Sequence, residues 1–128
     1  MSGLKMFIRI IFTIAVICVI ASSCEKVIFL PPPPLDTTKY ISFDTIIKPI
    51  FSKQGCINCH YTGRQDPDLS VDQYNSLVPK YIKLSDSLNP EASEFYQWIT
   101  TNSDHIPRTT TAEKASIKLW ISQGVRNN

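Results

Sequence analysis

The stretch CINCH at residues 56–60 decides how the rest of the sequence is interpreted. It separates two cysteines by two residues and places a histidine directly after the second cysteine. With this spacing, both sulfurs reach the two vinyl groups of one porphyrin from a single turn of backbone, and the imidazole comes to lie under the iron. The stretch therefore predicts one covalent haem of the c type, with Cys56 and Cys59 as attachment residues and His60 as the proximal iron ligand.

Three other kinds of site share parts of this motif. A thioredoxin-like redox pair would lie near a βαβ pattern, and no strand alternation surrounds residues 56–60. A tetrahedral zinc site would combine two cysteines with two histidines a few residues apart, whereas His105 lies far downstream of His60. A disulfide between Cys56 and Cys59 would close a very short loop and stabilise the fold little. We expect haem, with zinc and the disulfide as alternatives.

The first 23 residues have the organisation of a bacterial export signal. Lys5 and Arg9 make the start positive, an uncharged apolar run follows over residues 10–21, and small residues end the segment. A membrane-spanning helix needs roughly 20 apolar residues, and this run is shorter. We therefore expect residues 1–23 to be a signal peptide rather than a permanent anchor.

Cys24 is the expected site of lipidation. The sequence ASSC at residues 21–24 resembles the lipobox of bacterial lipoproteins, in which the thiol is acylated and the cysteine becomes the first mature residue. Ala21 departs from the usual leucine, and the same residues also suit ordinary signal cleavage. Four prolines at residues 31–34 favour an extended polyproline II conformation, so residues 24–40 are predicted to be a lipid-attached Pro-rich linker.

Export agrees with the haem motif, because bacteria attach c-type haem outside the cytoplasm. We expect a lipid-anchored protein of the bacterial cell envelope, facing the periplasm or on the outer membrane, whose partners are the membrane and redox proteins that the sequence does not identify.

The charge balance argues against nucleic acid as a partner. The chain of 128 residues suffices for one domain. Its 13 Lys and Arg exceed its 11 Asp and Glu by two, and Lys5 and Arg9 of the signal account for that excess. The remaining charges are interspersed and give no basic face. No catalytic nucleophile arrangement, phosphate loop or paired carboxylates are recognisable, so we expect a protein that is not an enzyme.

After residue 41 the pattern predicts helices and no strand. The first helix is expected to begin near Ser42 or Asp44, with Pro49 either kinking it or ending it. The second helix is expected to begin at Ser70, because Ser70 and Gln73 form the pattern of a capping box.

The last two helices carry clearer start signals. Asn89 as N-cap and Pro90 at the first helical position predict the start of the third helix. Thr110 and Glu113 predict a capping box for the fourth, and Gly124 is the expected residue just beyond its end. Residues 41–128 are therefore predicted to form a small all-α domain of about four helices around the haem.

The placed motifs resemble the small monohaem cytochrome c domains of bacterial exported proteins, notably the planctomycete-type cytochrome c-like family. The resemblance covers residues 43–127. It is carried by KPIF at residues 48–51 before the haem motif, DLS at 68–70 followed by Tyr74, and IKLWISQG at 117–124. It implies a cytochrome c-like fold and electron transfer as the function.

One departure from this family concerns the second axial ligand of the iron. Members usually carry a Met-Pro pair before the last helix, where this chain has Ile106 and Pro107. The only methionines, Met1 and Met6, are expected to leave with the signal. His105 is then the candidate sixth ligand, and the alternatives are an open sixth site or a surface role for His105. An open site would favour a haem-based binder or sensor of small ligands over an electron carrier; a zinc-stabilised interaction module is the third hypothesis.

Overall fold

The computed structural model describes Gly3 and residues 34–128. The chain divides into two units, Met1–Pro31 and Pro32–Asn128, and the second is described below. Apart from Gly3, the predicted signal peptide, the lipidation site Cys24 and the first part of the Pro-rich linker lie outside the described residues. Among residues 34–128, no helix is long and apolar enough to cross a membrane.

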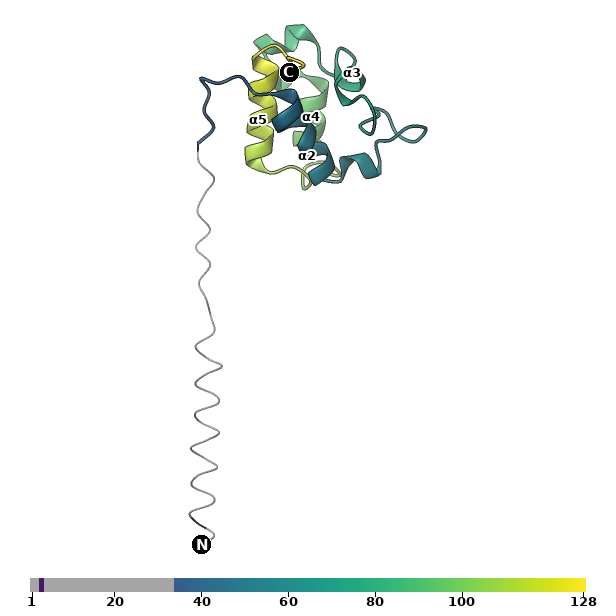
Figure 1. The fold of residues 1–128 in the computed structure, drawn as a ribbon, viewed down its shortest axis with the longest axis vertical. Helices are drawn as coiled ribbons and strands as arrows, with labels where there is room; N and C mark the ends of the chain where they lie inside the picture. Colours follow the sequence, from purple (N-terminus) through teal and green to yellow (C-terminus); the bar gives the residue numbers. More distant parts are fainter. Residues whose placement is uncertain (1–2, 4–33) are drawn as a thin grey trace. The chain divides into compact units, whose positions relative to one another are not determined.

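The second unit is all-α, as predicted (Figure 1). Every regular element in the described part of the chain is helical, and several are short turns of π or 3₁₀ helix. The elements are η1 (Phe43–Ile47), α2 (Lys48–Lys53), η2 (Cys56–Asn58), α3 (Gln73–Leu77), η3 (Leu84–Leu88), η4 (Pro90–Ala92), α4 (Glu94–Thr101) and α5 (Thr111–Ser122).

The first predicted helix begins at the expected cap and changes type along its length. The Ser42 hydroxyl accepts a hydrogen bond from the backbone N–H of Thr45, at the start of the π turn η1. The chain then continues as α2, whose first turn contains Pro49. Proline is tolerated there because the first turn of an α-helix leaves its N–H groups unpaired. Pro49 therefore does not end the helix, which continues to Lys53.

The prediction of a capping box at Ser70 and Gln73 is wrong. Both the backbone N–H and the hydroxyl of Ser70 donate to Oδ1 of Asp68, at 2.8 and 2.6 Å. The Gln73 side-chain amide donates instead to the carbonyl of Leu69. Asp72 is the N-cap of α3 and accepts from the N–H of Asn75. Ser70 therefore forms a local turn with Asp68 and does not cap the helix, as the sequence pattern had predicted it would.

The third predicted helix is interrupted. Asn89 and Pro90 begin η4, but this 3₁₀ turn ends at Ala92. Ser93 is extended, with φ −62° and ψ 136°, and its hydroxyl caps α4 by accepting from the N–H of Tyr96. Ser93 is also buried. Because a serine at this position offers its own cap, the chain restarts its helix there rather than continuing from Pro90.

The predictions for the last helix are confirmed. The Thr110 hydroxyl accepts from the N–H of Glu113 at 3.2 Å, and the Glu113 carboxylate accepts from the N–H of Thr110 at 2.8 Å. At the other end Gly124 has φ +88°. Its N–H donates to the Ile121 carbonyl, and the next N–H donates to the Trp120 carbonyl, which together form a Schellman motif.

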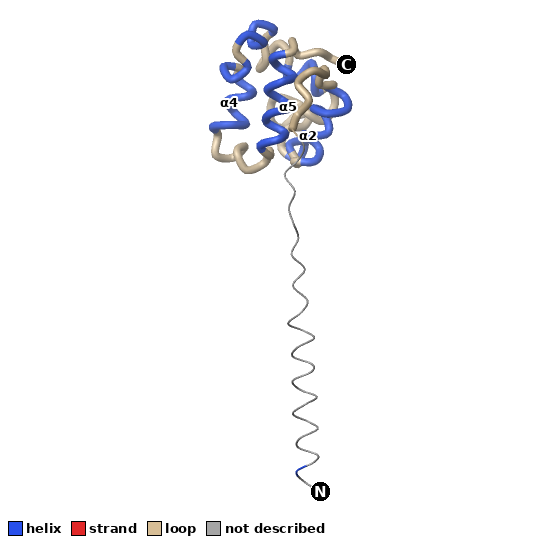
Figure 2. The backbone as a smooth tube through the Cα atoms, turned by 90° about the vertical axis from the view of Figure 1, so that its left-hand side faces the viewer, coloured by secondary structure: helices blue, strands red, loops and turns tan. Residues whose placement is uncertain are grey.

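The core lies where α5 packs against η1 and α4, and α4 and α5 run side by side (Figure 1, Figure 2). Trp120 of α5 is fully buried, and its ring lies 5.3 Å from that of Phe43. The Tyr74 ring meets Phe43 edge-on at 5.3 Å, and its hydroxyl donates to the Val125 carbonyl. These contacts hold α5 against the segment that leads into residues 56–60.

The Glu113 carboxylate joins the start of α5 to the end of α2. Besides Thr110, it accepts hydrogen bonds from the Gln54 amide at 2.8 and 2.9 Å and from Lys53 at 3.0 Å. Burial alone would raise the pKa of Glu113, but these hydrogen bonds outweigh it and lower the pKa to about 2. The ionised carboxylate is therefore the form that stabilises the fold.

We predict that Glu113→Gln removes a pH-dependent part of the stability. Because the folded pKa lies below the ordinary value of 4.5, the contribution of Glu113 is complete above about pH 4.5 and is lost as the pH falls toward 2. The wild type should be more stable than the variant by up to about 3 kcal/mol near pH 6, and the two should converge near pH 2. Urea unfolding at several pH values measures this. A difference that does not change with pH would contradict the assigned role.

Candidate functional site

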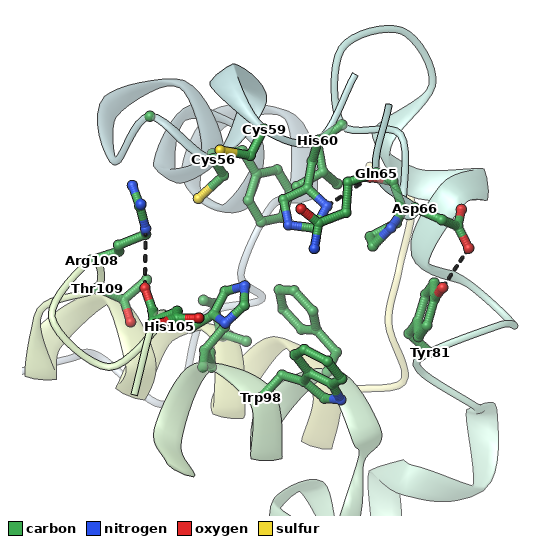
Figure 3. A pocket seen from close by; sticks show the side chains of 18 of the residues that line it. Cys56, Cys59, His60, Gln65, Asp66, Tyr81, Trp98, His105, Arg108 and Thr109 are labelled. Carbon is green, nitrogen blue, oxygen red and sulfur yellow. Dashed lines mark hydrogen bonds between the residues drawn. The ribbon is translucent and has the colours of Figure 1, made fainter. Parts of the chain in front are cut away.

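A cavity of about 710 Å³ opens beside the segment at residues 56–60 (Figure 3). Its volume lies within the usual range of about 300–1,000 Å³ for ligand sites. One wall comes from η2 and the loop after it, with Cys56, Cys59 and His60. The facing wall comes from α4 and the loop before α5, with Trp98 and His105. The structure thus brings every predicted haem-site residue of the domain to one cavity.

The two cysteines and His60 reach the same wall through a single turn of backbone. The N–H groups of Cys59 and His60 both donate to the Cys56 carbonyl, at 3.2 and 3.0 Å. Gly55 precedes this turn with φ +68°, a left-handed conformation that ends α2 and redirects the chain. The cysteines are half-buried and are not joined in a disulfide. Burial raises the pKa of the Cys56 thiol, so the neutral thiol is its form at neutral pH.

The orientation of His60 is fixed by a backbone carbonyl. Its Nδ1 lies 3.1 Å from the carbonyl oxygen of Pro67. A carbonyl oxygen can only accept, so Nδ1 carries the proton and Nε2 keeps its lone pair. Figure 3 shows the other edge of the ring directed into the cavity. An imidazole held in this way by an outer oxygen is the usual arrangement of a metal-ligating histidine.

His105 has the same arrangement on the facing wall. Its Nδ1 lies 3.1 Å from Oδ1 of Asn102, and this oxygen also accepts the N–H of Asp104 at 2.9 Å. Because the N–H of Asp104 can donate only to the amide oxygen of Asn102, it is this oxygen, and not the amide nitrogen, that faces the imidazole. Nδ1 of His105 is therefore again the donor. The Asn102 carbonyl further accepts the N–H groups of His105 and Ile106. Asn102 therefore shapes the loop and orients the imidazole that it carries.

The two imidazoles face one another across the cavity. Their ring centroids are 6.1 Å apart and their planes are inclined by 49°. A metal ion bound about 2 Å from one nitrogen of each ring would separate the centroids by roughly 6 Å, because each nitrogen lies about 1 Å from its own centroid. Burial, followed by the nearby His60, lowers the pKa of His105 and favours the neutral form that binds metals. The pair therefore has the spacing of two axial ligands on one ion.

The remaining walls are largely apolar. Phe51 and Phe95 meet edge-on at 6.1 Å, and Ile99 and Ile117 are buried beside them. Trp98 lies edge-on to His105 with centroids 5.5 Å apart and is itself 48% exposed at the mouth. An apolar cavity with two cysteines on one wall and two facing imidazoles fits a haem. Cys56, Cys59, His60 and His105 are the residues that would hold it.

The residues needed for zinc are not gathered in the same way. Within residues 34–128, no group of three or more His, Cys, Asp and Glu side chains lies close enough to hold a metal ion.

Ile106, where the family resemblance places a methionine, is 41% exposed and is not part of the cavity lining. The cavity is lined instead by its neighbour His105.

Sequence reasoning missed the groups that orient the two histidines. Pro67 contributes only a carbonyl oxygen, which no sequence pattern identifies. Asn102 precedes His105 by three residues, and this spacing alone does not determine which group the Asn102 amide contacts. Gly55 could have been found, because a glycine just after an apolar helical segment is typical of a helix end.

In comparisons with known proteins, no family model, curated protein or solved structure matches the chain.

We predict that Gly55→Ala destabilises the protein more than Gly63→Ala does. Both glycines have positive φ, +68° and +80°, so each alanine carries a backbone cost of roughly 1–2 kcal/mol. A Cβ at Gly55 would also lie 3.1 Å from the Asn58 side chain, whereas a Cβ at Gly63 meets nothing within 4 Å. Urea unfolding of both variants measures the difference. Equal losses would contradict the close approach of Asn58 to this turn.

Proposed function

We propose that this chain is an exported, membrane-tethered c-type cytochrome, which holds one covalent haem and transfers single electrons. The observation that supports this most strongly is the facing pair His60 and His105 at 6.1 Å, beside two cysteines on one wall of the cavity. It is proposed as an electron-transfer protein of the small cytochrome c type rather than as an enzyme.

In this proposal the residues have three roles, which are attachment of the haem, ligation of its iron and orientation of the two imidazoles. Cys56 and Cys59 would hold the haem through their sulfurs, and His60 and His105 would hold its iron through their Nε2 atoms. When bound, haem supplies reversible one-electron exchange at its iron. The Pro67 carbonyl and the Asn102 amide oxygen hold the two rings in place and make them stronger donors. Two imidazoles give a lower reduction potential than one imidazole and one methionine.

The orientation of His105 favours an electron carrier over a ligand sensor. A sensor needs an exchangeable or open sixth position, whereas the loop around Asn102 already presents an imidazole toward His60. An imidazole that is already held in position moves little when the iron gains or loses an electron. Such small structural change suits electron transfer. Binding of small ligands stays the alternative that the experiment below separates.

The proposed location is the bacterial cell envelope. The signal at residues 1–23, lipid at Cys24 and the Pro-rich linker would deliver the domain outside the cytoplasm and tether it at a membrane. Its partners there would be redox proteins and not nucleic acid.

The first test is the absorption spectrum of the full chain made in cells that mature c-type cytochromes. We expect haem that stays with the polypeptide after denaturing extraction, and low-spin bands in the reduced protein that CO does not change. His105→Ala should make the reduced iron bind CO, because it removes the sixth ligand. Ile106→Ala is the matched control, since it alters the adjacent exposed side chain and leaves His105 in place.

Two results would contradict the proposal in different ways. A protein that carries no covalent haem under these conditions would refute the cytochrome itself. Covalent haem that binds CO equally well in the wild type and in His105→Ala would refute ligation by His105 and support the ligand sensor.

A second prediction concerns Asn102. Asn102→Ala removes the acceptor for Nδ1 of His105, and loss of such an outer contact typically weakens a metal bond by about 10–100-fold. The reduced variant should therefore bind CO measurably at concentrations that leave the wild type unchanged. Asn102→Asp keeps an acceptor and should retain the low-spin spectrum with a lower reduction potential. Asn75→Ala, in which an exposed asparagine of α3 is removed, is the control. Wild-type behaviour of Asn102→Ala would contradict the assigned orientation.

A further inference from the structure

One end of the domain carries exposed apolar side chains that neither the core nor the cavity uses. Leu84 and Leu88 of the short turn η3 are 67% and 92% exposed, and Tyr40, just before the helices begin, is 59% exposed. None of these three residues belongs to the core or lines the cavity. We refer to Tyr40, Leu84 and Leu88 as the end patch.

The position of η3 follows from the way in which α4 and α5 are connected. The loop between these two helices lies at one end of the pair, so α4 begins and α5 ends at the opposite end (Figure 1, Figure 2). The turns η3 and η4 lead into α4, and both pack against α5. Leu84 and Leu88 therefore lie at the opposite end of the domain from the loop that carries His105.

The linker joins the domain at the same end. Oε1 of Gln123, just after α5, accepts the N–H of Ile41 at 2.8 Å, and its Nε2 donates to the Lys39 carbonyl at 2.9 Å. The Arg126 guanidinium lies 3.7 Å from the centre of the Tyr40 ring. These contacts fix the point from which the linker leaves the domain.

A lipid on Cys24 would keep this end of the domain close to a bilayer. Residues 24–38, extended at about 3.1 Å per residue, span about 45 Å. A short tether of this kind gives an effective concentration in the millimolar range. An apolar contact that is too weak to bind a free protein to the membrane would therefore be populated in the tethered one.

The end patch has the composition of a shallow membrane contact. Leucine side chains enter the boundary of the acyl chains, whereas tyrosine and arginine favour the level of the headgroups. The neighbouring charges of η3 and η4 largely offset one another. Asp86 accepts the backbone N–H of Lys83 at 2.8 Å, and Glu91 forms an ion pair with Lys118. The two leucines, rather than charge, would supply most of the attraction.

We propose that the end patch contacts the bilayer to which the chain is tethered, an inference that rests on the proposed function. Leu84 and Leu88 insert among the upper acyl chains, and Tyr40 and Arg126 lie among the headgroups. The loop that carries His105 then points away from the membrane, because it lies at the other end of α4 and α5. A redox partner outside the bilayer can reach that end of the domain.

Labelling from within the bilayer tests the contact directly. The full chain, with its lipid and haem, is reconstituted in phosphatidylcholine vesicles that contain a phosphatidylcholine with a diazirine on one acyl chain. After illumination, mass spectrometry of the peptides locates the label. We expect it within residues 84–88. Replacing both leucines, Leu84→Ser and Leu88→Ser, should lower this label at least about tenfold, because burial of one leucine already favours the apolar phase by roughly that factor.

Ile106→Ser is the matched control. It replaces another exposed aliphatic side chain, 41% exposed, in the loop at the other end of α4 and α5. This variant should leave the label within residues 84–88 unchanged, and high salt should leave it unchanged as well. All three replaced side chains are exposed, so the variants are expected to fold.

The outcomes separate the membrane contact from the proposed function. Covalent haem in a chain whose residues 84–88 take no label, or keep it in the double variant, would overturn the contact and leave the cytochrome intact. Label within residues 84–88 on a chain without covalent haem would overturn the cytochrome and leave the contact standing. Crosslinks between the Lys83 side chains of two copies, in place of lipid label, would assign the patch to a second copy and overturn the proposal. A mature chain without lipid on Cys24 would remove the tether on which the contact depends.

Discussion

The carboxylate of Glu113 connects the start of α5 to the end of α2 by hydrogen bonds, and both segments adjoin the walls of the cavity. It accepts from Thr110 at the start of α5 and from Gln54 at the end of α2. Cys56 follows Gln54 after one glycine, and the loop that carries His105 ends just before Thr110. One partly buried, hydrogen-bonded anion therefore joins the chain just before Cys56 to the end of the loop that carries His105.

The apolar core of the domain borders the cavity at α5. Ile117, Trp120 and Ile121 all belong to this core, and Ile117 also lines the cavity. A domain of this size buries a modest apolar area, and a cavity of about 710 Å³ beside its central helix removes packing contacts that the fold would otherwise gain. A covalent group within that space would restore those packing contacts in the folded chain. It would stay attached to the unfolded chain as well, so its contribution to stability would come from these contacts.

Sequence reasoning succeeded where a local signal decides the structure. Thr110, Glu113 and Gly124 each act through backbone groups a few residues away, and α5 has the predicted ends. It failed where two local signals compete. Asp68 accepts the hydrogen bond of the Ser70 hydroxyl, so Ser70 does not cap α3. Ser93 caps α4, so the helical turn that begins at Pro90 does not continue into it. For the site, the motif singles out Cys56, Cys59 and His60, and all three line one cavity. The loop around Asn102 is held by hydrogen bonds between residues two to four apart, and helical periodicity does not encode such loop contacts.

We propose above that one iron is held between His60 and His105 in a haem attached to this chain. The electron paramagnetic resonance spectrum of the oxidised, purified full chain tests it most directly, because the signal reports the axial ligands of ferric haem. We expect a low-spin signal of two imidazole ligands that disappears in His105→Ala. A high-spin signal in the wild type, or no ferric haem signal at all, would contradict it.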